Sequence, residues 1–525
     1  MSSTLRLTGT HLTIADTAAA SRDSSARIEL DPASRDTLKT SRAMVDRSIS
    51  GGQTIYGINT GFGKLASIRI PSDQLTTLQN NLIRSHAAGI GTPLPRNVVR
   101  AAMLLRANVL LRPTSGVRPD LVDALVALFN SNLVPVVPEQ GSVGASGDLA
   151  PLAHIAQVLM GEGEVFDAQD RRRPAGPALE EAGLAPFAFG PKEGLAFING
   201  TQAQTALLAL LVHDAWICWR SAVGAAAMSL EALRGTPVPL DHRIHDVRPH
   251  HGQRICAALM RTLLGDSQIR ESHRENDPRV QDAYSLRCTP QVLGAVADAI
   301  EFAERTAAVE LNASTDNPLV FANGDVLSGG NFHGQPVAQA LDFLAIALTT
   351  LQAISERRIE RLVNPDLSQG LPAFLTATPG ISSGFMMVQI TAASLVAESR
   401  TLAMPASIGS IPTDANQEDF VPMGMAAAWK ASRILANAQA VVGAEFLCAA
   451  QGLEFLRPLK PGRGVADLYG KIRGPEGVPP LKEDRTPSPD LERMTSLVAR
   501  GTLDPGNWLS SGPYSAEIAE GQGPV

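Results

Sequence analysis

The chain has 525 residues and a formal net charge of −7, and aromatic residues make up only 4% of it. This acidic, aromatic-poor composition disfavours binding to nucleic acids or to anionic membranes. No uninterrupted apolar run is long enough to span a membrane, and the first residues lack the apolar core of a signal peptide. Four cysteines without a CxxC pair predict reduced thiols in a cytoplasmic protein that has no cysteine metal site.

The first part of the chain combines a small mixed region with predicted helices. Residues 1–50 contain short alternating apolar stretches, whereas residues 51–64 are rich in Gly, Asn and Thr and are typical of a mobile loop. Apolar residues at helical spacing then predict three helices, over 75–88, 98–111 and 121–130.

The most informative stretch runs from Gly141 to Asp148 and reads Gly-Ser-Val-Gly-Ala-Ser-Gly-Asp. Three glycines at a spacing of three keep side chains out of a tight turn and permit a positive φ. The prolines of the preceding Val-Pro-Val-Val-Pro run favour an extended approach to this turn. We expect Asp148 to cap a helix whose first turn accepts Pro151.

Such a turn allows its own backbone to cyclise. If the Gly147 nitrogen is pressed against the Ala145 carbonyl, loss of water that includes the Ser146 hydroxyl leaves a methylidene-imidazolone ring, an electrophile. The alternative is a plain structural turn or an anion-binding loop. A Walker-type phosphate loop needs Lys and then Ser or Thr after its last glycine, and this chain has Asp148 there.

The rest of the chain predicts a mainly α protein. Residues 166–191 are rich in Pro, Gly and charge and indicate a surface excursion, and residues 200–233 are apolar enough for a long buried helix. Long helices are also predicted over 290–311, 335–362, 384–402 and 423–451. We expect a central bundle of long antiparallel helices with a smaller mixed N-terminal region. The expected parts are residues 1–199, 200–455 and 456–525, with a loose end after residue 504.

The Gly141 stretch and the Leu-Ala-Pro-Leu-Ala-His that follows it closely resemble the signature of the ammonia-lyases and aminomutases that carry a methylidene-imidazolone (MIO) group. This resemblance implies that MIO forms from Ala145, Ser146 and Gly147 and that no dissociable cofactor is needed. It also implies a small amino-acid substrate and a homotetramer whose active sites each combine residues of more than one chain.

The resemblance gives Tyr56 and Asn199 chemical roles. Tyr56 lies in a glycine-flanked loop, where an aromatic anchor is the simpler interpretation, but the resemblance implies a base that removes the substrate's β-proton. Asn199 could cap the helix that follows it. The resemblance instead implies that Asn199 lies beside the prosthetic group and the substrate.

Four further residues are candidates for the same site. Gln281, Tyr284 and Arg287 are three apart, and if this run is helical they share one face. The resemblance assigns Arg287 to the substrate carboxylate, and Tyr284 and Gln281 to the lining of the catalytic site. It makes Phe332 a wall of the pocket, although a phenylalanine is more commonly a core residue.

His86 and Glu418 bear on the choice of substrate. The Ser-His pair at His86 resembles the histidine-specific members of the family, and a Glu418 carboxylate facing an imidazole would pair with it. The expected reaction is therefore elimination of ammonia from L-histidine to give trans-urocanate. Departures from the histidine-specific pattern occur at Gly334, Gln335, Met404, Gly409, Asp414, Phe420 and Pro422.

Two other functions remain open on the sequence. An MIO lyase or a 2,3-aminomutase that acts on another amino acid or a betaine would use the same catalytic groups. A non-catalytic scaffold would have lost one of them, and the sequence retains Tyr56, Ser146, Asn199, Tyr284 and Arg287.

Overall fold

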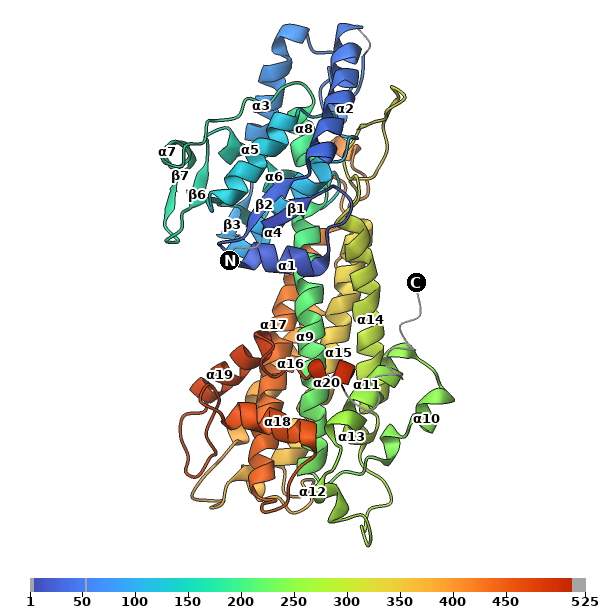
Figure 1. The fold of residues 1–525 in the computed structure, drawn as a ribbon, viewed down its shortest axis with the longest axis vertical. Coiled ribbons are helices and arrows are strands. Elements are labelled where there is room, and N and C mark those ends of the chain that lie inside the picture. The colour runs from blue at the N-terminus through green and yellow to red at the C-terminus, as the bar shows by residue number, and fades with distance from the viewer. Residues whose placement is uncertain (1–3, 52–53, 512–525) are drawn as a thin grey trace. The chain divides into compact units, whose positions relative to one another are not determined.

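The computed structural model describes residues 4–51 and 54–511. The chain forms two compact units (Figure 1). Unit 1 comprises Met1–His213, Ala303–Asp342 and Pro405–Trp429, and unit 2 comprises Asp214–Phe302, Phe343–Met404 and Lys430–Val525. This division into two units does not test the three predicted parts, 1–199, 200–455 and 456–525, which stay a prediction.

Unit 1 surrounds a helical core with short strands. Its helices are α1 Ile14–Arg22, α2 Pro32–Ser50, α3 Leu75–His86, α4 Arg96–Leu110, α5 Pro119–Asn130, α6 Leu149–Leu159, α7 Ala175–Glu181 and α8 Glu193–Ile198, with 3-10 turns η1 Gly63–Leu65, η2 Ser72–Gln74 and η5 Asp414–Asn416. Its strands are β1 Thr4–Leu7, β2 Arg27–Leu30, β3 Ile90–Pro93, β4 Val134–Pro135, β5 Pro138–Gln140, β6 Glu164–Phe166, β7 Arg172–Pro174, β8 Leu319–Val320 and β9 Val326–Leu327.

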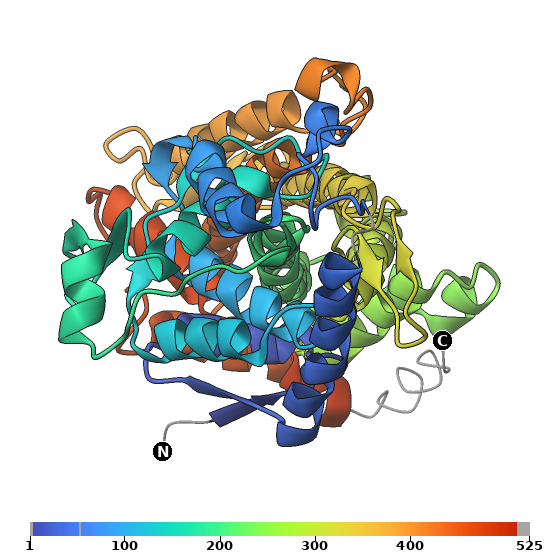
Figure 2. The same cartoon turned by 90° about the horizontal axis from the view of Figure 1, so that it is seen from above.

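Among the described residues these strands form four small sheets. Strand β1 pairs with β2 in parallel, with Leu5 opposite Ile28. The pairs β3–β5 and β8–β9 are antiparallel, and so is the three-stranded order β4-β6-β7. The β6–β7 hairpin and α7 project at the margin of unit 1 (Figure 1 and Figure 2). The segment predicted as a surface excursion thus contains regular structure.

Long helices form the core of unit 2. Four of them begin or end in unit 1: α9 Gln202–Ala232, α14 Thr289–Glu310, α15 Gln335–Val363 and α17 Gly424–Glu454. The other elements of unit 2 are η3 Val238–Leu240, α10 His242–Asp246, α11 His251–Leu263, α12 Gln268–Glu271, α13 Tyr284–Arg287, η4 Ala373–Leu375, α16 Met386–Leu402, α18 Arg463–Arg473, α19 Ser488–Ala499 and α20 Asn507–Ser511. Successive long helices run in opposite directions, which confirms the predicted mainly α bundle.

Buried polar contacts join the long helices within unit 2. The Arg358 side chain of α15 forms an ion pair with Glu445 of α17, with Nη2 2.8 Å from Oε2, and both side chains are fully buried. Ser229 of α9 donates to the same Glu445 carboxylate at 2.7 Å. The Trp219 indole of α9 donates to the Leu293 carbonyl of α14 at 2.7 Å. Buried charges need such partners, so this network fixes the packing of the bundle.

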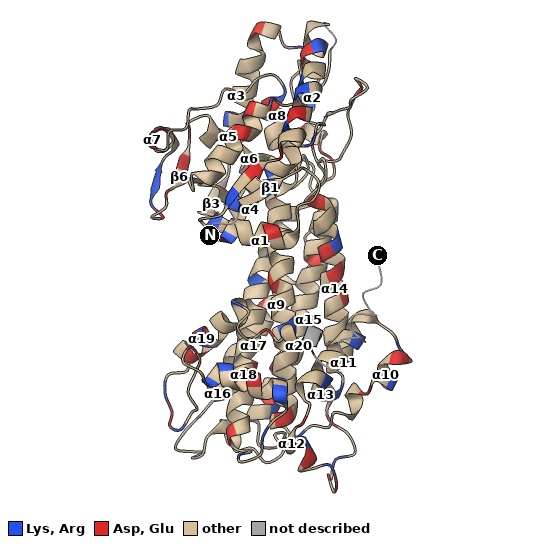
Figure 3. Ribbon diagram, in the orientation of Figure 1, with Lys and Arg blue, Asp and Glu red and all other residues tan. Residues whose placement is uncertain are grey.

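Helices α9, α15 and α17 are long and apolar enough, by length and composition, to cross a membrane. The sequence prediction missed this because it counted only uninterrupted apolar runs, and few charges interrupt α9 (Figure 3). Of the most apolar window of each helix, 72%, 67% and 83% respectively is buried inside the protein. Packing within the protein accounts for most of this apolar surface.

Candidate active site

Five predicted site residues meet at one cavity in unit 1. The cavity has a volume of about 530 Å³, and its lining includes Tyr56, His86, Ser146, Asn199 and Glu418. They come from the loop before η1, the end of α3, the turn between β5 and α6, the end of α8 and the turn that follows η5. A concave site with several convergent polar groups is the usual form of a small-molecule pocket.

The glycine-rich turn has the predicted backbone. Strand β5 leads into it and α6 follows it, and Gly141, Gly144 and Gly147 have φ values of 145°, 75° and 72°. Gly144 and Gly147 pair across the turn in an antiparallel bridge. A Cβ on Gly147 would overlap the Gly200 backbone, so this position accepts only glycine.

Backbone hydrogen bonds from distant segments hold the turn. The Gly334 N–H donates to the Gly144 carbonyl at 3.1 Å, and the Met423 N–H donates to the Val143 carbonyl at 2.9 Å. The Asp148 N–H donates to the Gly200 carbonyl at 2.7 Å. Every one of these partners belongs to unit 1.

The prediction that the Asp148 side chain caps the next helix is wrong. Asp148 occupies the N-cap position of α6 but makes no side-chain capping hydrogen bond there. Its carboxylate instead accepts from the Gln204 N–H at 2.8 Å, at the start of α9, and from the Ser142 hydroxyl at 2.9 Å. Asp148 is fully buried, and burial raises the pKa of its carboxyl to about 6.

Glu418 and Asn199 form hydrogen bonds with Ser146. The Ser146 hydroxyl donates to the Glu418 carboxylate, and the Asn199 amide donates to the Ser146 carbonyl at 2.8 Å. Asn199 follows α8 and its amide nitrogen reaches the turn, while its Oδ1, the atom that a cap would use, has no hydrogen-bond partner among the described residues, so Asn199 does not cap α9. Glu418 is half-buried, and its other carboxylate oxygen accepts from the Thr413 hydroxyl at 2.7 Å.

Tyr56 approaches the cavity from an irregular segment. The Gly63 N–H donates weakly to the Tyr56 hydroxyl oxygen, at 3.4 Å. Burial raises the pKa of the Tyr56 phenol, and the nearby charges of Asp414 and Glu418 raise it further. Residues 52–53 of the predicted mobile loop lie outside the described residues.

His86 presents a defined tautomer to the cavity. Its Nδ1 lies 2.8 Å from the Leu82 carbonyl oxygen, which can only accept, so Nδ1 carries the proton. Burial lowers the pKa of His86 and favours the neutral ring. Its Nε2 is therefore a hydrogen-bond acceptor.

These residues fit the predicted prosthetic group. Ala145 is buried, Gly147 has no side chain to block approach to the Ala145 carbonyl, and the Ser146 hydroxyl has a carboxylate partner. Asn199 Oδ1 is buried and has no hydrogen-bond partner among the described residues. The turn thus supplies the three cyclising residues together with polar groups around them.

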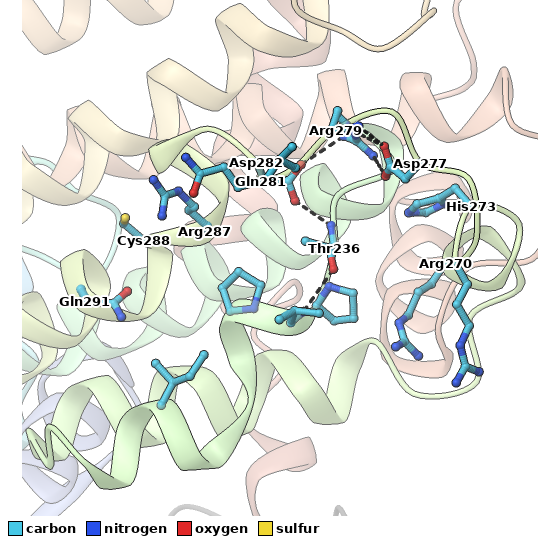
Figure 4. Close-up of a pocket in the computed structure, with 16 residues that line it drawn as sticks. Thr236, Arg270, His273, Asp277, Arg279, Gln281, Asp282, Arg287, Cys288 and Gln291 are labelled. Atoms are coloured by element: carbon cyan, nitrogen blue, oxygen red, sulfur yellow. Dashed lines mark hydrogen bonds and ion pairs between the residues drawn. The ribbon is translucent and has the colours of Figure 1, made fainter.

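The structure places the remaining predicted residues elsewhere. Gln281 and Arg287 line a cavity of about 610 Å³ in unit 2 (Figure 4). Tyr284 and Arg287 belong to the four-residue helix α13, where the Arg287 guanidinium carbon lies 4.5 Å from the Tyr284 ring centroid. Gln281 precedes this helix, so the run is not helical throughout and the three residues do not share one helical face. Phe332 is half-buried in the turn before α15 in unit 1.

Sequence reasoning missed two residues that shape the site in unit 1. Arg106 is fully buried in α4 and donates to the Ala196 carbonyl and, at 3.3 Å, to the Asn199 carbonyl. Burial lowers the pKa of Arg106 to about 10. The sequence signal for Arg106 was a positively charged residue within the apolar run of α4. Asp414 lines the cavity itself and was noted only as a departure from the family pattern.

Comparison with known proteins identifies similar chains. Residues 12–474 match the aromatic amino acid lyase family. The histidine ammonia-lyase of Myxococcus xanthus (strain DK1622) is 51% identical over 479 residues, which cover 91% of this chain and 93% of that protein. The histidine ammonia-lyase of Anaeromyxobacter sp. (strain K) is 50% identical over 509 residues, covering 95% of this chain and 99% of that protein.

Solved structures share the fold. The crystal structure of histidine ammonia-lyase from Trypanosoma cruzi matches with a TM-score of 0.90 and 42% sequence identity, covering 99% of this chain and 97% of that one. The tyrosine aminomutase from Streptomyces globisporus matches with a TM-score of 0.91 and 35% identity, covering 97% of this chain and 99% of that one.

Proposed function

The chain belongs to the aromatic amino acid lyase family and is a carbon–nitrogen lyase, and from that premise we propose that it eliminates ammonia from L-histidine to give trans-urocanate. One observation carries the proposal: the Ser146 hydroxyl donates to Glu418 in a cavity that also holds Tyr56 and His86. Sequence identity of about 50% to histidine ammonia-lyases over most of the chain supports the choice of substrate.

We propose that Ala145, Ser146 and Gly147 form the MIO group. The ring supplies an electrophilic methylidene carbon, which the twenty ordinary side chains lack. The chain's part is to hold the turn: the bridge between Gly144 and Gly147 closes it, and Asn199 holds the Ser146 carbonyl at 2.8 Å. When that hydroxyl leaves as water, its oxygen must gain a proton while the Ser146 α-carbon loses one, and the Glu418 carboxyl group at the hydroxyl is placed to relay protons between them.

The remaining side chains of this cavity act on the substrate. We assign proton removal from the β-carbon to Tyr56 and recognition of the imidazole to His86 and Glu418. The neutral His86 ring offers Nε2 as an acceptor for an imidazole N–H, and the Glu418 carboxylate accepts from the other side of a protonated or neutral ring. A phenyl ring would leave both polar groups without a partner, which costs binding free energy.

The carboxylate of the substrate requires a cation, and we assign it to Arg287, with Gln281, Tyr284 and Phe332 in the lining. We propose that the protein is a cytoplasmic homotetramer and that these groups reach each site from another subunit. Apolar side chains on three helices of unit 2 support a subunit interface, because they are exposed in the single chain: Phe302, Phe343, Ile346, Met387 and Ile390.

A second candidate is a 2,3-aminomutase. The tyrosine aminomutase structure, at 35% identity and a TM-score of 0.91, shows that this fold also serves a mutase. A mutase would return ammonia to the β-carbon, and a β-amino acid would accumulate instead of the free unsaturated acid.

Two measurements on one preparation test the proposal. With L-histidine, we expect ultraviolet absorption of urocanate to appear, and the intact protein to weigh about 36 Da less than its sequence, since two waters leave. Ser146→Ala removes the leaving hydroxyl, so we expect a fold with unchanged thermal stability, no mass deficit and a rate lower by several orders of magnitude.

Each outcome is decisive for one part of the proposal. A wild-type protein without the mass deficit, or a Ser146→Ala protein with near-normal turnover, contradicts the prosthetic group. A β-amino acid product, or turnover of another amino acid with none of histidine, contradicts the substrate and reaction while leaving the group intact.

A further inference from the structure

The segment around η5 forms a strained turn at the cavity in unit 1. Thr413 and Glu418 pair across it: the Thr413 N–H donates to the Glu418 carbonyl at 2.8 Å, and the Glu418 N–H donates back at 3.3 Å. Between them Asp414, Ala415 and Asn416 have φ values of 47°, 51° and 66°. Three successive non-glycine residues in the left-handed region carry a conformational cost that other contacts must offset.

One such contact joins the Asp414 side chain to the segment that carries Tyr56. The Lys64 N–H donates to Asp414 Oδ2 at 3.0 Å. Gly63 has a φ of 52°, and a Cβ there would overlap the Asp414 carboxylate. The carboxylate thus lies directly on the Gly63–Lys64 backbone. The adjacent Gly63 N–H donates to the Tyr56 hydroxyl oxygen, so the same short piece of backbone contacts both side chains.

The other end of the turn contacts the electrophile loop. The Thr413 hydroxyl donates to Glu418 Oε2 at 2.7 Å, and Glu418 Oε1 accepts from Ser146. A single turn of six residues therefore touches the segment of the proposed base and the residue that becomes the electrophile. Movement of this turn would therefore change two distances together, the one from Asp414 to the Tyr56 segment and the one from Glu418 to Ser146.

The Asp414 hydrogen bond holds the Gly63–Lys64 end of the Tyr56 segment. Backbone hydrogen bonds with Ile68 and Ile70 fix Gly61 and Asn59, whereas the N–H groups of Gly63 and Lys64 donate to side chains, the Tyr56 hydroxyl and the Asp414 carboxylate. A bond from a backbone N–H to a carboxylate is stronger than one to a neutral acceptor. Segments with little regular structure open locally at low free-energy cost, and each remaining contact then sets the open fraction.

We propose that Asp414 is a positioning residue that holds the Gly63–Lys64 backbone, and Tyr56 with it, closed over the cavity. It acts through the loop, because its carboxylate accepts from the Lys64 N–H. The proposal rests on the proposed function, which gives Tyr56 its role as the base.

Trypsin gives a readout that does not depend on activity, because Lys64 is itself a cleavage site. Asp414→Gly removes the acceptor but tolerates the positive φ, and Asp414→Asn keeps both an acceptor oxygen and the left-handed conformation. Asn416→Gly is the matched control: it places glycine at another left-handed residue of the same turn, where the exposed Asn416 side chain makes no hydrogen bond within the described chain.

We expect Asp414→Gly to speed native-state cleavage after Lys64 by about tenfold, the effect of losing one hydrogen bond to a charged acceptor. Asn416→Gly should be cleaved within about twofold of wild type, and Asp414→Asn, which keeps a neutral acceptor, should be cleaved at a rate between those of wild type and Asp414→Gly. In parallel, kcat/KM for histidine should fall about tenfold in Asp414→Gly and recover in part in Asp414→Asn. If trypsin cleaves Asp414→Gly after Lys64 at the wild-type rate, or cleaves Asp414→Asn as fast as Asp414→Gly, the proposal is overturned.

Hydrogen exchange on the wild-type protein tests the same bond without a variant. The Lys64 amide should be protected, and exchange at the rate of an unstructured peptide would also overturn the proposal, even if Asp414→Gly does not fold. Absence of urocanate formation would contradict the proposed function alone, since cleavage and exchange at Lys64 report the loop whatever the enzyme's substrate.

Discussion

Tyr56 illustrates how neighbouring residues set the chemistry of a single side chain. Burial contributes most to its raised pKa, and the charges of Asp414, Glu418 and Asp316 add to the shift, while the Gly63 N–H opposes it. Within a single chain Tyr56 is therefore a neutral phenol at neutral pH. A base must first lose its own proton, so the same environment that excludes water also limits the active fraction.

This leads to a prediction about pH. Tyr56 can act as a base only after it loses its proton, which happens mainly at a pH above its raised pKa. We therefore expect kcat/KM for histidine to increase with pH through the neutral and mildly alkaline range, by up to about tenfold per pH unit. Steady-state urocanate formation from pH 6 to 10 measures it. Tyr56→Phe serves as the control and should be nearly inactive throughout. A wild-type rate that stays flat or falls between pH 7 and 9 contradicts Tyr56 as the base.

At the scale of elements, apolar periodicity predicted the long helices closely. The range 75–88 corresponds to α3 Leu75–His86, and 335–362 corresponds to α15 Gln335–Val363. Helix α2 was missed, since its 19 residues bury only Leu38, Ser41 and Val45 and present no continuous apolar stripe. The predicted loose end contains the short helix α20, and residues 512–525 lie outside the described part.

The site was less accessible to sequence reasoning than the helices. The turn at Gly141 carried its own signal in the spacing of its glycines, whereas the resemblance supplied the roles of Tyr56, Asn199 and Glu418. Long-range contacts left no local signal: Lys64 and Asp414 are 350 residues apart in sequence. Asp148 looked like a cap for the helix next to it because nothing in the sequence places the start of α9 beside it.

Asp148 joins two helices, and its titration should be visible in stability. Its folded pKa of about 6 lies above its ordinary value of 3.8, so the native state holds the proton more tightly than the unfolded chain. This contribution is fully present below pH 4 and is lost as pH rises through 6, by roughly 3 kcal/mol in total. Asp148→Asn cannot titrate there.

Urea unfolding of wild type and Asp148→Asn between pH 4 and 8 measures the difference. The free energy of unfolding of the wild type should fall relative to that of the variant as pH rises from 4 to 7, and the difference should be constant above that range. If the two free energies of unfolding change with pH in parallel over the whole range, folding does not raise the pKa of Asp148, and the prediction is contradicted.

At the scale of the whole molecule, the proposed catalytic groups are divided between two cavities. Tyr56, Ser146 and Glu418 line one in unit 1, and Gln281 and Arg287 line another in unit 2. The proposed elimination needs both sets, since we assign activation of the substrate to the first and binding of its carboxylate to the second. An oligomer in which a cavity of one subunit meets a unit of another would combine the two sets.

Complementation between two inactive variants tests this assembly. Tyr56→Phe disables the unit 1 set and Arg287→Gln the unit 2 set, and each homo-oligomer should be nearly inactive. If every site combines chains, co-expressed hybrids purified by two different tags should regain activity at roughly a quarter of their sites, because each site draws each set at random from a wild-type or variant chain. Mixing the two purified homo-oligomers without subunit exchange is the control and should restore nothing. If all the groups of a site came from one chain, every chain would carry one defect, and the hybrids would be no more active than their parents.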